Sequence, residues 1–233
     1  MRLERLSGLD LRMGAGPWAF ANAERQRIDA HWRKLVVANP KLWNGEVLIC
    51  TSAEVSDGVL SARFAATDYA SFVAWRDWGW PDRGVRNCFG VPAAVSADGA
   101  LVFGVMAPFT LNGGMAYPPS GSLEMRDVGP DGTVDIRGSI RTELAEETGL
   151  DAAVARSGAL LAIFEGQRLA VVEVLAFPNP FSEMEDIFHR HTSGDPDAEL
   201  SAIEAIRAVS QIDSRMPEYA HEIIRQFQFW IGS

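Results

Sequence analysis

The sequence predicts an α/β or α+β layered fold, and three observations lead to that fold class. Apolar residues make up 47% and charged residues 22% of the 233 residues, a balance typical of a folded globular chain. Segments with strand patterns and segments with helical patterns follow one another in mixed order. A Pro- and Gly-containing stretch at 81–84 interrupts them, as loops between structural units do. We therefore expect an N-terminal accessory region over 1–85 and a larger domain over 86–233.

The first part carries helical and strand-like patterns in turn. Apolar residues from Phe20 to Val36 recur at helical spacing, and Asn39-Pro40 is expected to end that helix because proline disfavours helical geometry in the residue before it. Asp57-Gly58 is a hairpin turn signal between two strands. The expected elements are a helix over 17–38, strands over 46–50 and 59–65, and a helix over 69–78.

The second part begins with strand-like segments and ends with helices. The expected elements are strands over 91–95 and 101–106, a helix over 136–148, strands over 159–164 and 169–177, a long polar segment, and helices over 198–209 and 217–231. The last helix carries the apolar residues Ile223, Ile224, Phe227, Trp230 and Ile231. Packing against the core is the expected role of this face, and a homodimer interface is the alternative.

The charge and cysteine content exclude several classes of function. With 21 Lys and Arg against 31 Asp and Glu, the net charge is −10, which argues against nucleic-acid binding and against anionic membrane surfaces, since both need basic residues. Cys50 and Cys88 fit no metal or redox spacing, so we expect two buried thiols and a reducing, cytoplasmic location. No apolar stretch reaches the roughly 18 residues of a membrane span.

The helix predicted over 136–148 carries the chemistry. Asp135 is placed to cap its start and Gly149 to end it in a left-handed conformation. Glu143, Glu146 and Glu147 stand at i, i+3 and i+4, within an arc of about 100° on one face. Like charges at this spacing destabilise a helix, whereas a divalent cation such as Mg²⁺, which prefers carboxylate oxygens, would reverse that penalty.

These residues resemble the Nudix box, the signature of the Nudix hydrolases. Its second half reads Arg-Glu-apolar-any-Glu-Glu-any-Gly-apolar, and Glu143-Leu144-Ala145-Glu146-Glu147-Thr148-Gly149-Leu150 matches it from the first Glu onward. Upstream, Pro118 to Glu124 is similar to the family's glycine loop, with Gly121 in the glycine position. The resemblance covers about 118–150 in quotable motif and 86–210 in overall pattern.

The match departs from the family pattern at two places. The first acidic position falls at Asp127, which implies an inserted loop of 7 residues before the helix, and Asp135 is the alternative. Thr142 stands where the family has an arginine that holds a metal-binding carboxylate. Arg141 is adjacent but points about 100° away around the helix, so another cation must do this work or metal binding is weaker.

The resemblance implies an α/β/α sandwich with a mixed sheet and a Mg²⁺- or Mn²⁺-dependent pyrophosphohydrolase. Such enzymes split a nucleoside diphosphate linked to a group X into a nucleoside monophosphate and X-phosphate. The residues implied as metal ligands are Glu143, Glu146, Glu147 and Asp127. Glu199, in an acidic stretch expected to begin a helix, is the favoured additional catalytic acid. Gly121 and Arg141 are expected to contact the substrate.

The substrate and two rival functions stay open at this point. The segment Asn39 to Gly45 is similar to Nudix proteins related to UDP-sugar pyrophosphatases, which favours a nucleotide sugar, with ADP-ribose and similar small molecules next. The departures from the box suggest a second hypothesis, a Nudix-fold sensor that binds a nucleotide without turnover. A third is an unrelated α+β domain whose acidic helix is only solvent-exposed surface.

Overall fold

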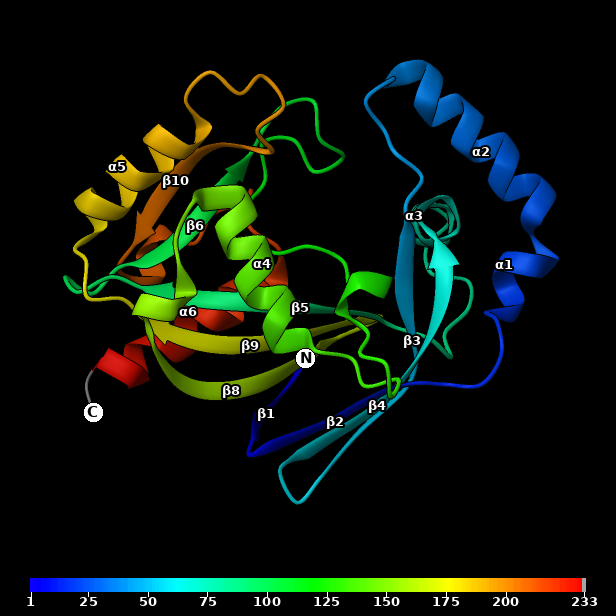
Figure 1. Cartoon of the computed structure of the whole chain (residues 1–233), viewed down its shortest axis with the longest axis horizontal. Coiled ribbons are helices and arrows are strands. Elements are labelled where there is room, and N and C mark those ends of the chain that lie inside the picture. The colour runs from blue at the N-terminus through cyan, green and yellow to red at the C-terminus, as the bar shows by residue number, and fades with distance from the viewer. Residues whose placement is uncertain (232–233) are drawn as a thin grey trace.

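A computed structural model describes the backbone of residues 1–231 and the side chains of residues 1–227. Two sheets organise the chain (Figure 1). The larger sheet contains β1 (Arg2–Leu6), β5 (Asn87–Val95), β6 (Leu101–Met106), β7 (Ala116–Tyr117), β8 (Arg156–Glu165), β9 (Arg168–Ala176) and β10 (Leu200–Ile206). The smaller sheet contains β2 (Gly8–Met13), β3 (Glu46–Ser56) and β4 (Val59–Asp68).

The larger sheet is mixed, as predicted. Its strand order is β1-β8-β9-β5-β6-β10, with β7 paired to β6. Strands β5 and β9 run parallel, whereas the β1–β8, β8–β9, β5–β6, β6–β7 and β6–β10 pairs are antiparallel. In the smaller sheet, β4 pairs in parallel with β2 and antiparallel with β3.

The helices fall into two groups. Alongside the smaller sheet lie α1 (Ala19–Ala23), α2 (Arg25–Ala38) and α3 (Tyr69–Asp77) (Figure 1). The larger sheet carries α4 (Ile136–Thr148), α5 (Phe181–Thr192) and α6 (Glu218–Ile231). Three short 3₁₀ turns complete the described chain: η1 (Met125–Asp127), η2 (Ala152–Val154) and η3 (Val209–Gln211).

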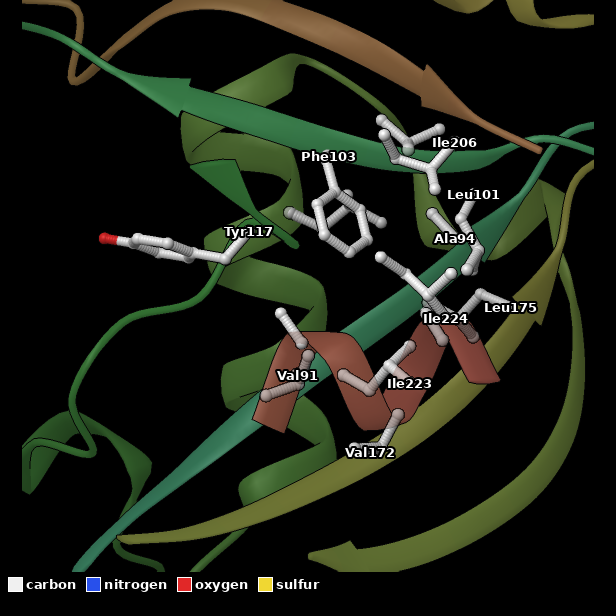
Figure 2. Packing of buried hydrophobic residues seen from close by; sticks show 14 of the residues in the cluster. Val91, Ala94, Leu101, Phe103, Tyr117, Val172, Leu175, Ile206, Ile223 and Ile224 are labelled. Atoms are coloured by element: carbon white, nitrogen blue, oxygen red, sulfur yellow. The ribbon is translucent and has the colours of Figure 1, made fainter. Parts of the chain in front are cut away.

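Helices α4 and α6 cover opposite faces of the larger sheet. On β5, Gly90 faces α4, because a Cβ placed there would lie 2.5 Å from Ile140 Cγ1. The preceding residue Phe89 faces α6, where its ring meets Tyr219 at 5.2 Å. Since side chains alternate along a strand, this confirms the predicted α/β/α sandwich. Figure 2 shows the core on the α6 side, where Ile223 and Ile224 of that helix meet Val91 and Val172.

The N-terminal region is tied to the larger sheet by strand pairing. β1 pairs with β8, and the chain then turns at Ser7 into β2 of the smaller sheet. Cys50 on β3 exchanges backbone hydrogen bonds with Arg86 at 3.0 and 2.8 Å. The division into a region 1–85 and a domain 86–233 stays a prediction. Strand β1, from the first of these parts, belongs to the larger sheet, whose other strands all come from residues 86–233.

Most predicted elements are confirmed, and the differences are elements that were not expected, one helix that is split, and one helix that is a strand. Strands β1, β2 and β7 and helix α5 were not expected; Pro180 stands at the N-cap of α5, where its missing N–H costs no helical hydrogen bond. The helix expected over 17–38 is split at Glu24 into α1 and α2. The helix expected over 198–209 is instead strand β10. A bulge between Leu200 and Ala202 lets Leu200 and Ile203, which are three residues apart in sequence, both be buried. This spacing of buried residues imitates that of a helix.

The remaining expectations concern the cysteines and the last helix. Cys50 and Cys88 are free and buried, as predicted. Ile223, Ile224 and Phe227 pack into the core of their own chain, while the side chains of Trp230 and Ile231 lie outside the described residues. The homodimer alternative stays a prediction. No helix within residues 1–231 is long and apolar enough to cross a membrane.

Candidate active site

A cavity of about 590 Å³ lies between the two parts of the chain and receives side chains from both. Residues 86–233 supply a wall of carboxylates, and residues 1–85 supply a wall rich in aromatic residues. The carboxylates that line the cavity include Glu124, Glu143, Glu146, Glu147 and Glu199. A volume of this size is within the range of about 300–1,000 Å³ that small-molecule sites occupy.

Helix α4 presents the three box glutamates because its sequence fixes both ends and one face. The Asp135 carboxylate accepts a hydrogen bond from the Gly138 N–H at 2.9 Å, and Gly149 ends the helix at φ +73°. Ile140 and Leu144 are fully buried on the opposite side. The predicted helix 136–148, with its N-cap and C-cap, is confirmed residue for residue.

The electrostatics of the acidic wall are unfavourable for the negative charges it holds. Burial raises the pKa of Glu143 to about 7, with the neighbouring Glu146 adding to the rise and Arg126 opposing it. Burial also raises the pKa of Glu147, to which Glu143 and Glu199 contribute. The Oε2 atom of Glu147 is buried and has no hydrogen-bond partner among the described residues. A carboxylate oxygen in that state is costly unless a cation reaches it.

Arg126 on η1 is the cation nearest to this wall. Its guanidinium donates to Glu143 Oε1 at 2.8 Å and to Glu146 Oε1 at 2.9 Å, and it lies 3.3 Å from Glu124 Oε2. The side chain at Thr142, where the resemblance expects an arginine, makes no such contact in the described chain. Arg126 therefore holds the carboxylates from the loop side, a contact that sequence spacing along α4 does not reveal.

Gly121 lies in the cavity wall directly against Glu143. A Cβ atom at this position would overlap the Glu143 carboxylate, so any other residue would displace that carboxylate from its present position. The backbone of the adjacent Ser120 lowers the pKa of Glu147, against the larger effect of burial. In the structure Gly121 contacts a carboxylate of the protein, and its expected contact with a substrate stays a prediction.

Three predicted residues lie elsewhere. Asp127 accepts a hydrogen bond from the Glu124 N–H at 2.8 Å and caps η1, so Glu124 takes its place in the cavity. Asp135, the alternative, caps α4. Arg141 donates to both carboxylate oxygens of Glu173 at 3.2 Å, because that glutamate is fully buried on β9 and needs a counter-charge. Neither Asp127 nor Arg141 lines the cavity.

Glu199 reaches the site from a strand edge. It stands immediately before β10, and burial together with Glu146 raises its pKa. The expectation of a helix there is wrong, yet the residue lines the cavity. Its neighbour Asp197 forms an ion pair at 2.5 Å with Lys41, whose ammonium also lies 4.1 Å from the Phe109 ring centroid.

The sequence predicts core packing for most of the tryptophans between 43 and 80, with stacking on a base as the alternative for one near a cleft, and it identifies none of the residues of the aromatic wall. That wall includes Tyr69, Phe72 and Trp80 from around α3 and Trp43 from the loop after α2. Tyr117 joins it from β7; Figure 2 shows its ring directed away from the aliphatic cluster, and its hydroxyl accepts from Asn112 Nδ2 at 3.0 Å. The tryptophan-rich composition of residues 43–80 was the available signal, but spacing does not tell which rings face a cavity.

The donor set suits a hard divalent cation, although no ready-made ligand cluster is present. Among residues 1–231, no group of three or more His, Cys, Asp or Glu side chains is close enough to hold a metal ion. Glu143 and Glu146 both turn to Arg126 instead. Several carboxylates converge on one cavity, and one has a buried, unpartnered oxygen. Carboxylate oxygens are the ligands that Mg²⁺ prefers.

Comparison with known proteins gives structural likenesses only. No family model and no curated protein matches the sequence. The chain is similar to a MutT protein from Methanosarcina mazei Go1, at 14% identity and a TM-score of 0.39 over 64% of this chain and 96% of that one. It is similar to the Nudix hydrolase RenU from M. smegmatis, at 14% identity and 0.40 over 62% and 84%.

A third likeness is to a bifunctional NMN adenylyltransferase/ADP-ribose pyrophosphatase from Francisella tularensis, solved with AMP and a Mn ion. It has 15% identity and a TM-score of 0.44 over 68% of this chain and 46% of that one. All three likenesses stay below a TM-score of 0.5. The fold class is an α/β/α sandwich with a carboxylate-lined cavity, and the functional argument rests on the residues of that cavity.

Proposed function

We propose that this chain is a metal-dependent hydrolase that cleaves the phosphoric anhydride bond of a nucleoside diphosphate linked to a group X. The observation that carries the proposal is the buried Glu147 Oε2, which has no partner in the described chain and lies among further carboxylates in the cavity. Negative charge gathered in this way is unfavourable in the protein alone. A bound divalent cation would offset that penalty, and it would also offset the negative charge of a diphosphate bound beside it.

The residues proposed to hold Mg²⁺ or Mn²⁺ are Glu143, Glu146 and Glu147. When bound, the metal ion would neutralise diphosphate charge and lower the pKa of a coordinated water. Asp127 and Arg141 are left out of the proposed site because their side chains are committed to η1 and to Glu173. Glu124 lines the cavity beside Arg126 and replaces Asp127 in the proposal.

The chain's own residues account for the proton and the leaving phosphate. Water attacks one phosphorus, its proton passes to a carboxylate, and the P–O bond to the bridging oxygen breaks, giving a nucleoside monophosphate and X-phosphate. We assign the proton to Glu199, since its raised pKa suits a general base. Arg126, which forms paired hydrogen bonds with carboxylates, has the geometry to bind phosphate oxygens as well.

A nucleotide sugar is our proposed substrate class. The segment Asn39 to Gly45, which resembles UDP-sugar pyrophosphatase relatives, supplies Asn39, Lys41, Leu42, Trp43 and Gly45 to the cavity lining. Its place in the cavity lining supports the proposal that the segment contacts the substrate and does not only link a helix to a strand.

The test is phosphate release from nucleotide sugars, ADP-ribose, dinucleotides and nucleoside triphosphates, with a phosphatase as coupling enzyme and with Mg²⁺ or Mn²⁺. Glu146→Gln and Glu147→Gln are expected to lose metal-dependent turnover. Glu54→Gln, which removes an equal charge from an exposed position on β3, is expected to keep it. Equal rates in all four proteins would indicate a contaminating activity and reject the assignment.

A second candidate function is nucleotide binding without turnover. It is favoured by Arg126, which occupies two of the proposed metal ligands, and by the absence of the box arginine at position 142. Under this hypothesis nucleotides raise the temperature of unfolding, because a ligand that binds only the native state stabilises it, while no compound in the panel is hydrolysed.

A further inference from the structure

We propose that Trp80 is the platform on which the base of the nucleotide stacks, so that the nucleoside end of the substrate lies against the N-terminal region. The inference rests on the proposed function, because that function places the diphosphate at the carboxylates of α4. It adds the orientation of the substrate and the residue that recognises its base.

The backbone at Trp80 has a conformation that a tryptophan rarely adopts. Helix α3 ends at Asp77, and the two residues Gly79 and Trp80 then have φ values of +76° and +62°. Glycine reaches this region freely, whereas a bulky residue there is strained. The Trp80 N–H donates to the Trp75 carbonyl at 2.9 Å and holds the turn. Glycine or asparagine would suit the turn better, so the turn itself does not explain the indole ring.

The surroundings fix the direction of that ring. It packs at 86° against Trp75, with 4.4 Å between centroids, and Trp75 is fully buried with its indole N–H bonded to the Asp82 carbonyl at 2.9 Å. On the side of the larger sheet, the Arg168 guanidinium lies 5.6 Å from the Trp80 centroid and is itself paired with Glu165 at 2.9 Å. Trp80 is half-buried and lines the cavity. A ring fixed by these two contacts, with part of its surface on the cavity, needs little reordering to receive a flat ligand.

A nucleobase is the ligand that this arrangement suits. Stacking of a base on an aromatic side chain strengthens binding and tolerates any base, because every base has a flat face. Trp80 shares one cavity with Glu143, Glu146 and Glu147, as a nucleotide that contacts both walls requires. Asn87, at the start of β5, lines the same cavity, and its amide can both donate to and accept from the edge of a base.

The experiment measures binding of products rather than turnover. Dissociation constants of AMP, GMP, CMP and UMP are determined by calorimetry on the full chain in excess MgCl₂, with ribose 5-phosphate and glucose 1-phosphate as probes that lack a base. Trp80→Ala is expected to weaken the best nucleoside monophosphate about tenfold or more and to leave both base-free probes unchanged. Trp80→Phe keeps a stacking surface and is expected to bind within about threefold of the wild type.

Two further variants distinguish loss of the Trp80 ring from loss of stability of the fold. Trp80→Gly relieves the backbone strain while removing the ring, so its unfolding temperature is expected to stay near that of the wild type while base-dependent binding is lost. Trp78→Ala removes a neighbouring tryptophan that packs on Arg27 and Phe20, outside the cavity lining, and is expected to leave nucleotide binding unchanged.

The outcomes that overturn the inference differ from those that overturn the proposed function. Wild-type protein that binds no nucleoside monophosphate more tightly than ribose 5-phosphate, or Trp80→Ala that weakens all probes equally, rejects the base platform. Loss confined to glucose 1-phosphate would assign Trp80 to X and also rejects it. A protein that shows the expected base dependence but hydrolyses nothing in the panel would retain the platform and reject the hydrolase.

Discussion

Gly121 lies so close to Glu143 that a Cβ atom on the glycine would overlap the glutamate's carboxylate. The loop before α4 and the first box glutamate therefore fix each other's positions. This contact joins the two halves of the motif that the sequence analysis recognised separately, at residues 118–124 and 143–150. It also explains the glycine by close approach, with no need for a left-handed φ.

Gly121→Ala is accordingly expected to displace the Glu143 carboxylate and to reduce turnover by at least tenfold, since misplacing a catalytic group by about 1 Å can cost about 100-fold. The measurement is kcat/KM on the best substrate of the panel. Gly8→Ala is the control, because a Cβ there meets Val59 Cγ2 at an ordinary 3.5 Å. A Gly121→Ala protein with wild-type kcat/KM would show that the position of Glu143 is unimportant.

Arg126→Gln is expected to lower stability in EDTA and to lower it less when Mg²⁺ is added. The arginine neutralises Glu143 and Glu146, and its loss leaves both carboxylates without that cation. Because Arg126 and Glu146 are partly solvent-screened, the loss should be about 1 kcal/mol rather than the value for a buried pair. The measurement is the midpoint of thermal unfolding with and without MgCl₂.

Arg215→Gln is the matched control for that experiment. Arg215 also pairs with two carboxylates, Glu204 and Asp213, but outside the cavity lining. Its effect on stability should be the same with and without Mg²⁺. A magnesium response equal in both variants would mean that the ion does not bind where Arg126 sits.

Helix α4 could be predicted from the sequence because its determinants are local. A cap at Asp135, a glycine at 149 and an apolar stripe fix its ends and its buried face, and the helical repeat then places three glutamates together. The partners of that face are not local. Arg126 and Trp80 lie 17 and more residues from the glutamates along the chain, and only tertiary packing brings them to the same cavity.

Arg141 and Glu199 show two ways in which local reasoning fails. Arg141 was expected to contact substrate, but its partner Glu173 lies on β9, 32 residues away, and a fully buried carboxylate outweighs an exposed ligand site as a partner for a guanidinium. Glu199 reaches the cavity although the expected helix is a strand, because the antiparallel pairing of β10 with β6 sets its position. The acidic residue type of Glu199 correctly indicated a residue of the cavity, whereas the predicted type of secondary structure was wrong.

Asp98 provides a test of stability against pH. The Ser96 hydroxyl, the Phe181 N–H and the Arg207 guanidinium lower the pKa of Asp98 to about 2. Because the folded pKa lies below the unfolded value of about 3.8, the stabilisation is fully present above pH 4 and disappears as the pH falls toward 2. Asp98→Asn should therefore unfold at a lower temperature than the wild type near neutral pH.

The measurement for Asp98 is the difference in unfolding midpoint between wild type and Asp98→Asn at several pH values. That difference should shrink steadily below pH 4, because the wild type then also loses the charge. Asp57→Asn is the control, since Asp57 lies at an exposed turn. A difference that stays constant down to pH 2 would show that the Asp98 charge does not stabilise the start of α5.

Lys41 connects the N-terminal region to the loop that carries Glu199, through its ion pair with Asp197 and its contact with Phe109. Both partners of the ion pair are largely exposed, so the pair is worth less than about 1 kcal/mol. Lys41→Gln is therefore expected to raise KM by less than about fivefold and to leave kcat nearly unchanged, since the loop moves but the carboxylates of α4 do not. The double variant Lys41→Asp/Asp197→Lys should recover most of the loss. If kcat falls with KM unchanged, Lys41 acts on the reacting phosphates and does not merely hold the loop.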